Sequence, residues 1–135
     1  MGRIEHVNLT VSNPERTARM LEQLFGWQVR WDGPTRAGGR TIHVGSENAY
    51  VALCSGNNVT FTEDNFVKGR PLNHIGVEVE DLDVAHARVV EAGLHPGDYD
   101  VYEPGRRFYF FDHDGVEFEV VSYAPAGETQ EQATA

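Results

Sequence analysis

The stretch that decides the fold is "LNHIGVEV" at residues 72–79, together with its counterpart "IEHVNLTV" at residues 4–11. Both are short runs in which β-branched apolar residues alternate with other residues, which is the pattern of a half-buried strand. Each run has a histidine at its third position, and these histidines, His6 and His74, are 68 positions apart. Two such similar strands indicate an internal repeat.

Each of these strands is followed by a helical pattern and then by further strand patterns. The first helix has Ser12 or Asn13 as a candidate cap, Pro14 in its first turn and Gly26 at its end. The two predicted helices cover residues 12–26 and 80–93. The further predicted strands cover residues 27–33, 40–45, 49–55, 97–103 (a weak strand or a loop), 106–111 and 116–123.

The two copies align along most of their length. Gly26 and Gly93, which follow the helices, are 67 positions apart, and residues 40–53 align with 107–120 at the same offset without a gap. Solenoids need at least about three repeats for stability, so two copies favour one closed domain. The sequence therefore predicts an α+β fold in which two tandem βαβββ units form one pseudo-symmetric domain with a curled mixed sheet and a central cavity.

The expected boundaries follow from composition. Unit one covers about residues 3–55 and unit two about 72–123, within a single domain of residues 1–135. Between them, residues 56–71 are polar and rich in turn formers and are predicted to be a linker. The low-complexity residues 124–135 are predicted to be a tail.

Composition excludes several classes of partner. The chain of 135 residues has 21 acidic and 11 basic side chains and a formal net charge of −10. Nucleic acids and anionic membrane surfaces are polyanions, so neither is an expected partner, whereas metal cations are compatible with this charge. The single cysteine, Cys54, excludes an intrachain disulfide. With no apolar leader and no run of membrane-spanning length, we expect a cytoplasmic protein.

Strand alternation predicts which side chains share a face. Val7, Leu9 and Val11 should face the first helix, which leaves the polar side chains of that strand on the opposite face. The same reasoning applies to the other strands, and the polar faces line a cavity if the two sheets curl together. The side chains predicted on these faces are His6, Asn8, Thr10, Tyr50, Ala52, Cys54, His74, Gly76, Glu78, Glu117 and Glu119.

Two histidines and a carboxylate in one cavity would form a metal site. Imidazole and carboxylate suit first-row divalent ions, and three protein ligands leave coordination positions open for substrate or water. The candidate ligands are His6, His74 and Glu119. The alternative from the residues alone is two ordinary strand histidines and a surface acid.

The paired units, with "IEHVNLTVSNPERTARML", "LNHIGVEVEDLDVA" and "YFFDHDGVEFEVVSY", resemble the vicinal oxygen chelate superfamily over about residues 3–123. This superfamily includes glyoxalase I, extradiol dioxygenases, fosfomycin-resistance enzymes and bleomycin-binding proteins. The resemblance implies metal ligands on the first strand of each unit and on the last strand of the second, which are His6, His74 and Glu119. It also implies a divalent ion such as Fe, Mn, Ni or Zn, a small-molecule substrate and a homodimer.

Several positions discriminate within the family. Glyoxalase I has a fourth ligand where this chain has Ala52, so the resemblance argues against that activity. Extradiol dioxygenases and fosfomycin-resistance transferases have an active-site tyrosine at the position of Tyr109, ten residues before Glu119. The alternative for Tyr109 is a packed aromatic residue. Asn8 replaces a threonine of the fosfomycin-resistance transferases, and Arg106 and Arg107 are candidates to face an anionic ligand.

The substrate-pocket candidates are Asn8, His43, Tyr50, Ala52 and Arg107, with Tyr109 as the catalytic candidate. His43 is ambiguous. Alternation directs it into the cavity, whereas the gapless repeat places it over Phe110 and directs it away. The other histidines are expected at the surface: His86, His95 and His113.

These features predict a divalent-metal-dependent enzyme whose small substrate chelates the metal through adjacent oxygens. A three-ligand site favours dioxygenase-like or transferase-like chemistry over that of glyoxalase I. One alternative is a non-catalytic binding protein of the bleomycin-resistance type, for which the net charge of −10 suits a cationic drug. Another is a structural or regulatory domain that retains the ligands by descent.

Overall fold

The computed structural model describes residues 1–35, 38–56, 72–102 and 105–123. The chain divides into two compact units, unit 1 (Met1–Asn65) and unit 2 (Phe66–Ala135), which are described separately. The predicted linker, apart from Gly56, and the whole predicted tail lie outside the described residues.

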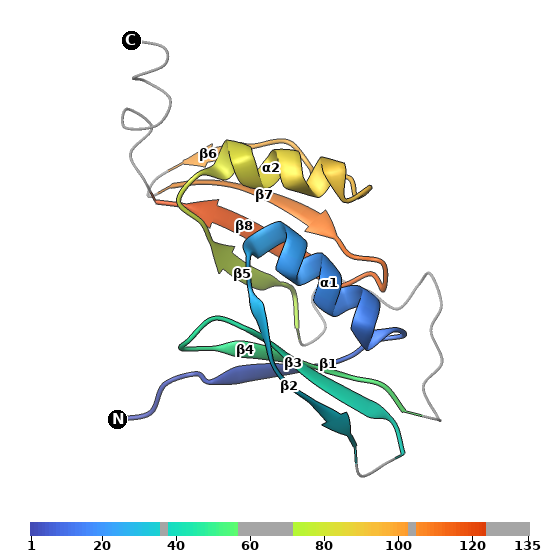
Figure 1. The fold of residues 1–135 in the computed structure, drawn as a ribbon. Helices are drawn as coiled ribbons and strands as arrows, with labels where there is room; N and C mark the ends of the chain where they lie inside the picture. Colours follow the sequence, from blue (N-terminus) through green and yellow to red (C-terminus); the bar gives the residue numbers. More distant parts are fainter. Residues whose placement is uncertain (36–37, 57–71, 103–104, 124–135) are drawn as a thin grey trace. The chain divides into compact units, whose positions relative to one another are not determined.

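Unit 1 is a four-stranded mixed sheet with one helix (Figure 1). The strand order is β1-β4-β3-β2, in which β1 runs parallel to β4 and the other neighbours are antiparallel. The elements are β1 (His6–Thr10), α1 (Pro14–Phe25), β2 (Gln28–Pro34), β3 (Arg40–Gly45) and β4 (Tyr50–Cys54).

Helix α1 begins and ends at the residues that the sequence indicates. Of the two candidate caps it is Asn13 that accepts a hydrogen bond from the Arg16 backbone N–H, at 3.0 Å. Gly26 ends the helix in the left-handed conformation, with φ of 70°. The apolar face of α1 packs on β3 and β4, and its buried residues are Pro14, Thr17, Ala18, Met20, Leu21 and Leu24.

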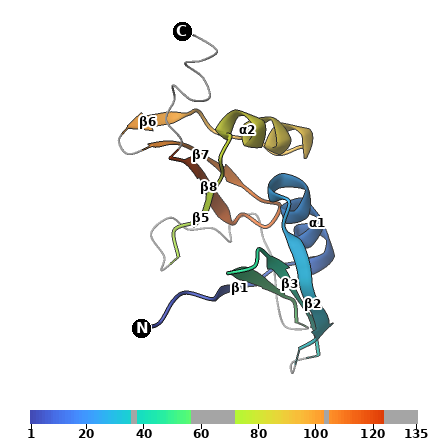
Figure 2. The same cartoon turned by 60° about the vertical axis from the view of Figure 1, so that its left-hand side comes forward.

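Unit 2 repeats this topology with the strand order β5-β8-β7-β6, and helix α2 lies along one face of its sheet (Figure 2). Strand β5 is parallel to β8, and β7 is antiparallel to both β8 and β6. The elements are β5 (Ile75–Glu78), α2 (Leu82–Glu91), β6 (Asp100–Tyr102), β7 (Gly105–Phe111) and β8 (Glu117–Ser122). The prediction of two tandem α+β units with mixed sheets is confirmed.

Aromatic side chains fill the space between α2 and its sheet. Phe108, Phe110 and Phe118 are almost completely buried, and the rings of Phe110 and Phe118 stack at 5.2 Å. His86 on α2 is half-buried, with its ring 5.1 Å from that of Phe108. Its predicted surface position is therefore wrong, because this turn of the helix faces the sheet. His95 and His113 are exposed, as predicted.

The register of the hairpins corrects the gapless alignment of the two copies. His43 pairs with Ala52 in unit 1, whereas Tyr109 pairs with Glu119 in unit 2. His43 is therefore the counterpart of Tyr109, not of Phe110. The offset changes because the β7–β8 connection, residues 112–116, is one residue longer than the β3–β4 connection, residues 46–49. Alternation, rather than the gapless repeat, gave the correct orientation of His43.

Candidate functional site

We call the side of each sheet opposite its helix the helix-free face. On this face of unit 2, three side chains surround the Glu119 carboxylate. His74 Nε2 lies 2.9 Å from Oε1, and the Tyr109 hydroxyl donates to the same oxygen at 3.2 Å. Arg107 Nη1 donates to Oε2 at 2.7 Å. The side chains of Arg107 and Glu119 are each only 11% exposed. These four residues form the Glu119 cluster.

Strand pairing brings the cluster together. Tyr109 on β7 stands opposite Glu119 on β8, and Arg107 lies two residues earlier on β7, on the same face. His74 immediately precedes β5, which pairs in parallel with β8. All four side chains therefore meet through hydrogen-bonded neighbouring strands, although they are far apart in the sequence.

The cluster contains two atoms of the kinds that bind divalent metals. An imidazole nitrogen and a carboxylate oxygen lie side by side in His74 and Glu119. The second ring nitrogen of His74, Nδ1, is buried without a hydrogen-bond partner, and the Glu117 carboxylate is 3.9 Å away. Over the residues that the structure describes, no three His, Cys, Asp or Glu side chains form a ready metal site. The pair thus supplies two ligands of suitable chemistry, with Arg107 already bound to the same carboxylate.

The helix-free face of unit 1 has a group of aromatic rings instead of a charged cluster. The His6 ring stacks on Tyr50 at 4.9 Å, and the His43 ring stacks on Tyr50 at 4.5 Å. Trp31 lies 5.2 Å from His43, at a tilt of 47°. We call these four residues the aromatic row. The guanidinium of Arg30 lies 4.8 Å from the centre of the Tyr50 ring, in a cation–π contact.

The two histidines of the row differ in their surroundings. His6 is 42% exposed in its side chain, and its Nδ1 lies 2.9 Å from the Glu5 carboxylate. Burial lowers the pKa of His43 below its usual value, and the neighbouring His6 and Arg30 lower it further, while Glu5 partly opposes them. At neutral pH, His43 is therefore a neutral ring in a stack.

The remaining predicted pocket residues of unit 1 lie beside the row. Asn8 pairs with Ala52 across β1 and β4, and Ala52 is 2% exposed. The Asn8 side-chain amide donates to the Cys54 sulfur at 3.3 Å, and the Thr41 hydroxyl lies 3.4 Å from the same atom. Ala52 is the structural counterpart of Glu119, so unit 1 has no ligand atom at that position.

Sequence reasoning missed Arg30 and Trp31. The register between β2 and β3 shifts between Val29 and Trp31, so Arg30 is an extra, bulged residue. Because of this bulge, two consecutive side chains reach the same rings: Trp31 lies beside His43, and Arg30 lies over Tyr50. Simple alternation in "WQVRWDG" places them on opposite faces, so the sequence holds no signal that would have identified both.

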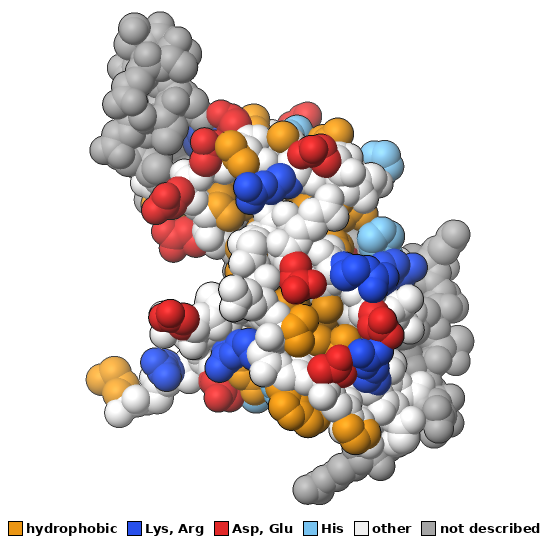
Figure 3. Space-filling view, viewed as in Figure 1, with side chains coloured by type: hydrophobic (Ala, Val, Ile, Leu, Met, Phe, Trp, Pro, Cys, Tyr) orange, Lys and Arg blue, Asp and Glu red, His pale blue; other side chains and the backbone are white. Residues whose placement is uncertain are grey.

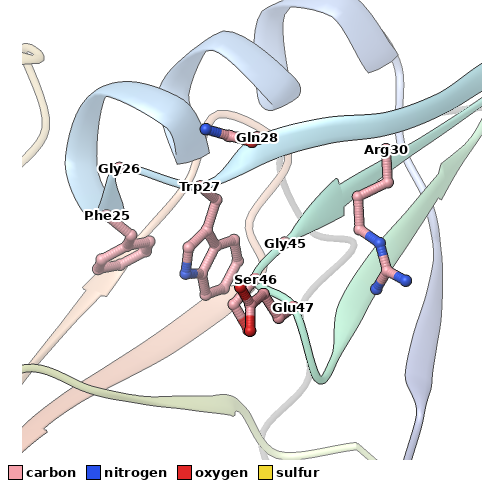
Figure 4. Close-up of a pocket in the computed structure, with 8 residues that line it drawn as sticks. All are labelled: Phe25, Gly26, Trp27, Gln28, Arg30, Gly45, Ser46 and Glu47. Atoms are coloured by element: carbon pink, nitrogen blue, oxygen red, sulfur yellow. The ribbon is translucent and has the colours of Figure 1, made fainter.

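A separate surface pocket of about 680 Å³ lies on unit 1. In Figure 4, Phe25 stands on one side of the Trp27 indole, and Ser46 and Glu47 stand on the other. The pocket is lined by Phe25, Gly26, Trp27, Gln28, Arg30, Gly45, Ser46 and Glu47. None of the predicted site residues lines it, so we base the functional proposal on the Glu119 cluster and the aromatic row, where the reactive side chains are.

Tandem βαβββ units with a histidine–carboxylate pair on the helix-free face of the second unit define the class: a protein with the vicinal oxygen chelate fold. The model of the Glyoxalase/Bleomycin resistance protein/Dioxygenase superfamily matches residues 3–120, and the chain belongs to this superfamily. The resemblance that the sequence indicated is therefore confirmed.

Solved structures of the same fold come from several bacteria. A glyoxylase/bleomycin resistance protein/dioxygenase domain from Frankia sp. EAN1pec is 23% identical, with a TM-score of 0.78 over 90% of this chain and 98% of that one. The fosfomycin resistance protein FosX from Mesorhizobium loti is also 23% identical, with a TM-score of 0.69 over 100% and 99%. A mutant FosX from Listeria monocytogenes, complexed with Mn(II) and 1S,2S-dihydroxypropylphosphonic acid, is 18% identical, with a TM-score of 0.71 over 100% and 99%.

A search of curated protein sequences gave no match. Neither helix in the described part of the chain has the length and apolarity that crossing a membrane requires. On the described part of the face shown in Figure 3, acidic and basic side chains are interspersed and do not gather into a basic patch.

Proposed function

We propose that the protein is a divalent-metal-dependent enzyme and that His74, Glu119 and His6 hold the metal. The observation that supports this proposal is the 2.9 Å approach of His74 Nε2 to Glu119 Oε1 on neighbouring strands of unit 2. Two imidazoles and one carboxylate suit Fe, Mn, Ni and Zn. Family membership supports His6 as the third ligand, because it occupies in unit 1 the position that His74 occupies in unit 2.

The residues around the pair have separate roles in this proposal. A bound divalent ion would supply Lewis-acid stabilisation of negative charge on adjacent oxygens of a small substrate. Tyr109, which donates to Glu119 Oε1 in the structure, would donate to a substrate oxygen. Arg107, which donates to Oε2 in the structure, would face an anionic group of the substrate. Tyr109 and Arg107 are hydrogen-bond donors that already lie on the helix-free face of unit 2.

The proposed reaction class is dioxygenase-like or transferase-like rather than that of glyoxalase I. Ala52 occupies the position of Glu119 in unit 1 and has no side-chain ligand or base. A site with three protein ligands leaves more coordination positions for the substrate than a site with four. FosX from Listeria monocytogenes, which shares this fold, is complexed with Mn(II), and this supports a divalent metal in the proposed site.

The test is metal affinity in matched histidine variants. Chelator-treated wild type, His74→Ala and His95→Ala are titrated calorimetrically with Mn(II), Fe(II), Ni(II) and Zn(II). His95 is exposed and has no proposed role, so it controls for the loss of a histidine. We expect wild type and His95→Ala to bind one ion per chain and His74→Ala to bind at least about tenfold more weakly, because a ligand is lost. A wild type that binds none of the four ions would overturn the proposal, as would equal affinities in all three proteins.

A non-catalytic binding protein is the second candidate. The observation that favours it is that Glu119 is already paired with Arg107 and His74, as a purely structural carboxylate would be. The net charge of −10 suits a cationic ligand. Tight binding of a basic glycopeptide such as bleomycin by chelator-treated protein, with no metal uptake, would select this alternative.

Family resemblance also leads us to propose a homodimer. Light scattering over a range of protein concentrations tests this assembly, and a mass of one chain at every concentration would contradict it.

A further inference from the structure

The helix-free face of unit 1 contains three aromatic side chains that the metal proposal does not use, those of Trp31, His43 and Tyr50. The aromatic row crosses all four strands, from His6 on β1 through Tyr50 and His43 to Trp31 on β2. Trp31, at the β2 end, is 48% exposed. A large aromatic ring that stays half-exposed beside other rings is a surface on which a flat ligand can stack.

Local sequence holds the Trp31 ring in place. A side chain at position 33 would come within 2.4 Å of the indole, so the ring fills the space that Gly33 leaves free. The ring of His43 also lies beside the indole, and the centres of the two rings are 5.2 Å apart. The orientation of Trp31 therefore depends on a missing Cβ and on a neighbouring ring, and both are built into the sheet.

Arg30 adds a positive charge to the same surface. The β-bulge directs its guanidinium over the Tyr50 ring at 4.8 Å. Within the described part of the chain, no carboxylate pairs with Arg30. Arg40 of the same unit differs in this respect, because it pairs with Asp32 and with Glu15. Arg30 is thus a cation fixed by an aromatic ring and available to an anion.

We propose that Arg30 and the aromatic row bind a planar aromatic carboxylate. The ring of the ligand stacks on Trp31, and its carboxylate pairs with the guanidinium of Arg30. A neutral aromatic compound lacks the ion pair, and a saturated carboxylate lacks the flat ring, so both bind more weakly. This inference goes beyond the proposed metal site, because the ligand contacts Trp31 and Arg30, which are not proposed metal ligands, and its binding needs no metal.

The experiment uses chelator-treated full-length protein in which Trp27→Phe leaves Trp31 as the only tryptophan of the two in the chain. Quenching of Trp31 fluorescence is titrated with benzoate, benzamide and cyclohexanecarboxylate. We expect benzoate to bind at least about tenfold more tightly than either comparison compound. Because the metal is absent throughout, this result and that of the metal titration can fail independently.

Variants test the two halves of the site. Arg30→Gln should lose about tenfold in benzoate affinity and leave benzamide unchanged, whereas Arg19→Gln, an exposed arginine on α1, should change neither. Gly33→Ala should displace the indole and weaken the binding of both aromatic ligands.

If Trp27→Phe does not fold, the indole N–H signal of Trp31 in the NMR spectrum of wild type replaces fluorescence. Equal binding of benzoate and cyclohexanecarboxylate would overturn the proposal, as would an unchanged Arg30→Gln. A Trp31 shielded from acrylamide in the free protein would show that another part of the chain or a second copy covers the row, which also overturns it.

Discussion

Ala52 in unit 1 and Glu119 in unit 2 occupy the same position of the same sheet topology, yet their surroundings differ completely. Around Ala52 the helix-free face has stacked rings and no acidic group at the equivalent position. Around Glu119 it has an arginine, a histidine and a tyrosine, all bound to one carboxylate. The first strand of each unit nevertheless places a histidine at the matching point, His6 and His74.

The comparison shows how one scaffold supports two kinds of surface. Arg107 is the counterpart of Thr41, Tyr109 of His43, and Glu117 of Tyr50, as the strand registers show. The helix-facing positions are buried and apolar in both units, so the fold constrains that side. The helix-free side is under no such constraint, and there unit 2 has a charged cluster while unit 1 has aromatic rings.

The largest expected effect comes from removing the central charge of unit 2. Glu119→Ala leaves the 11%-exposed Arg107 without this carboxylate and should lower the free energy of unfolding by about 3 kcal/mol. Adding Arg107→Met to Glu119→Ala should recover much of the loss, because the buried cation is removed as well. Denaturant unfolding of the two single variants and the double variant measures this coupling. Additive losses would show that the two groups do not depend on each other.

A smaller effect concerns competition for the Glu119 carboxylate. Arg107→Gln removes the cation that occupies Oε2 and should strengthen divalent-metal binding about tenfold, or about 1.4 kcal/mol. Arg106→Gln is the matched control, because Arg106 lies 3.8 Å from Asp83 and does not contact Glu119. Calorimetric titration with Mn(II) compares both variants with wild type. Weaker binding in Arg107→Gln would mean that the guanidinium orients the carboxylate for the metal and does not compete with it.

The smallest effect lies in the longer hairpin connection of unit 2. Asp112 accepts hydrogen bonds from the backbone N–H groups of Asp114 and Val116, but burial outweighs them and raises the pKa of Asp112 above its usual value. A raised pKa means that this group stabilises the fold most at low pH and loses that contribution as pH rises through the folded-state pKa. Relative to Asp112→Asn, wild type should therefore gain stability on acidification from neutral pH towards pH 4. Denaturant unfolding at several pH values measures the difference, and a constant difference would contradict the assignment.

Much of the fold was predictable because local signals and burial agree. The candidate caps Ser12 and Asn13, the glycine at position 26 and the alternating strands predict the elements of unit 1 from local sequence alone. The repeat then predicts the second unit and identifies His6 and His74 as equivalent positions. Each sheet is mixed because it contains one parallel and two antiparallel strand pairings.

The details of the site were less predictable, because they depend on single-residue changes in register. One additional residue in the β7–β8 connection moved the counterpart of Tyr109 from Ile42 to His43. The bulge at Arg30 placed two consecutive side chains against the same row. Composition and spacing do not encode where such an extra residue is absorbed. The ion pair of Arg107 with Glu119 was likewise outside sequence reasoning, which had assigned Arg107 to the substrate.

The metal site formed by His6, His74 and Glu119 is tested most directly by observing which histidines approach a bound paramagnetic ion. Substoichiometric Mn(II) is added to chelator-treated wild type, and the ring resonances of the six histidines are followed by NMR. We expect the signals of His6 and His74 to broaden together at the lowest Mn(II) additions, while those of the exposed His95 and His113 persist. Broadening of His74 without His6, or of the exposed histidines first, would contradict a metal held jointly by the two matched strands and Glu119.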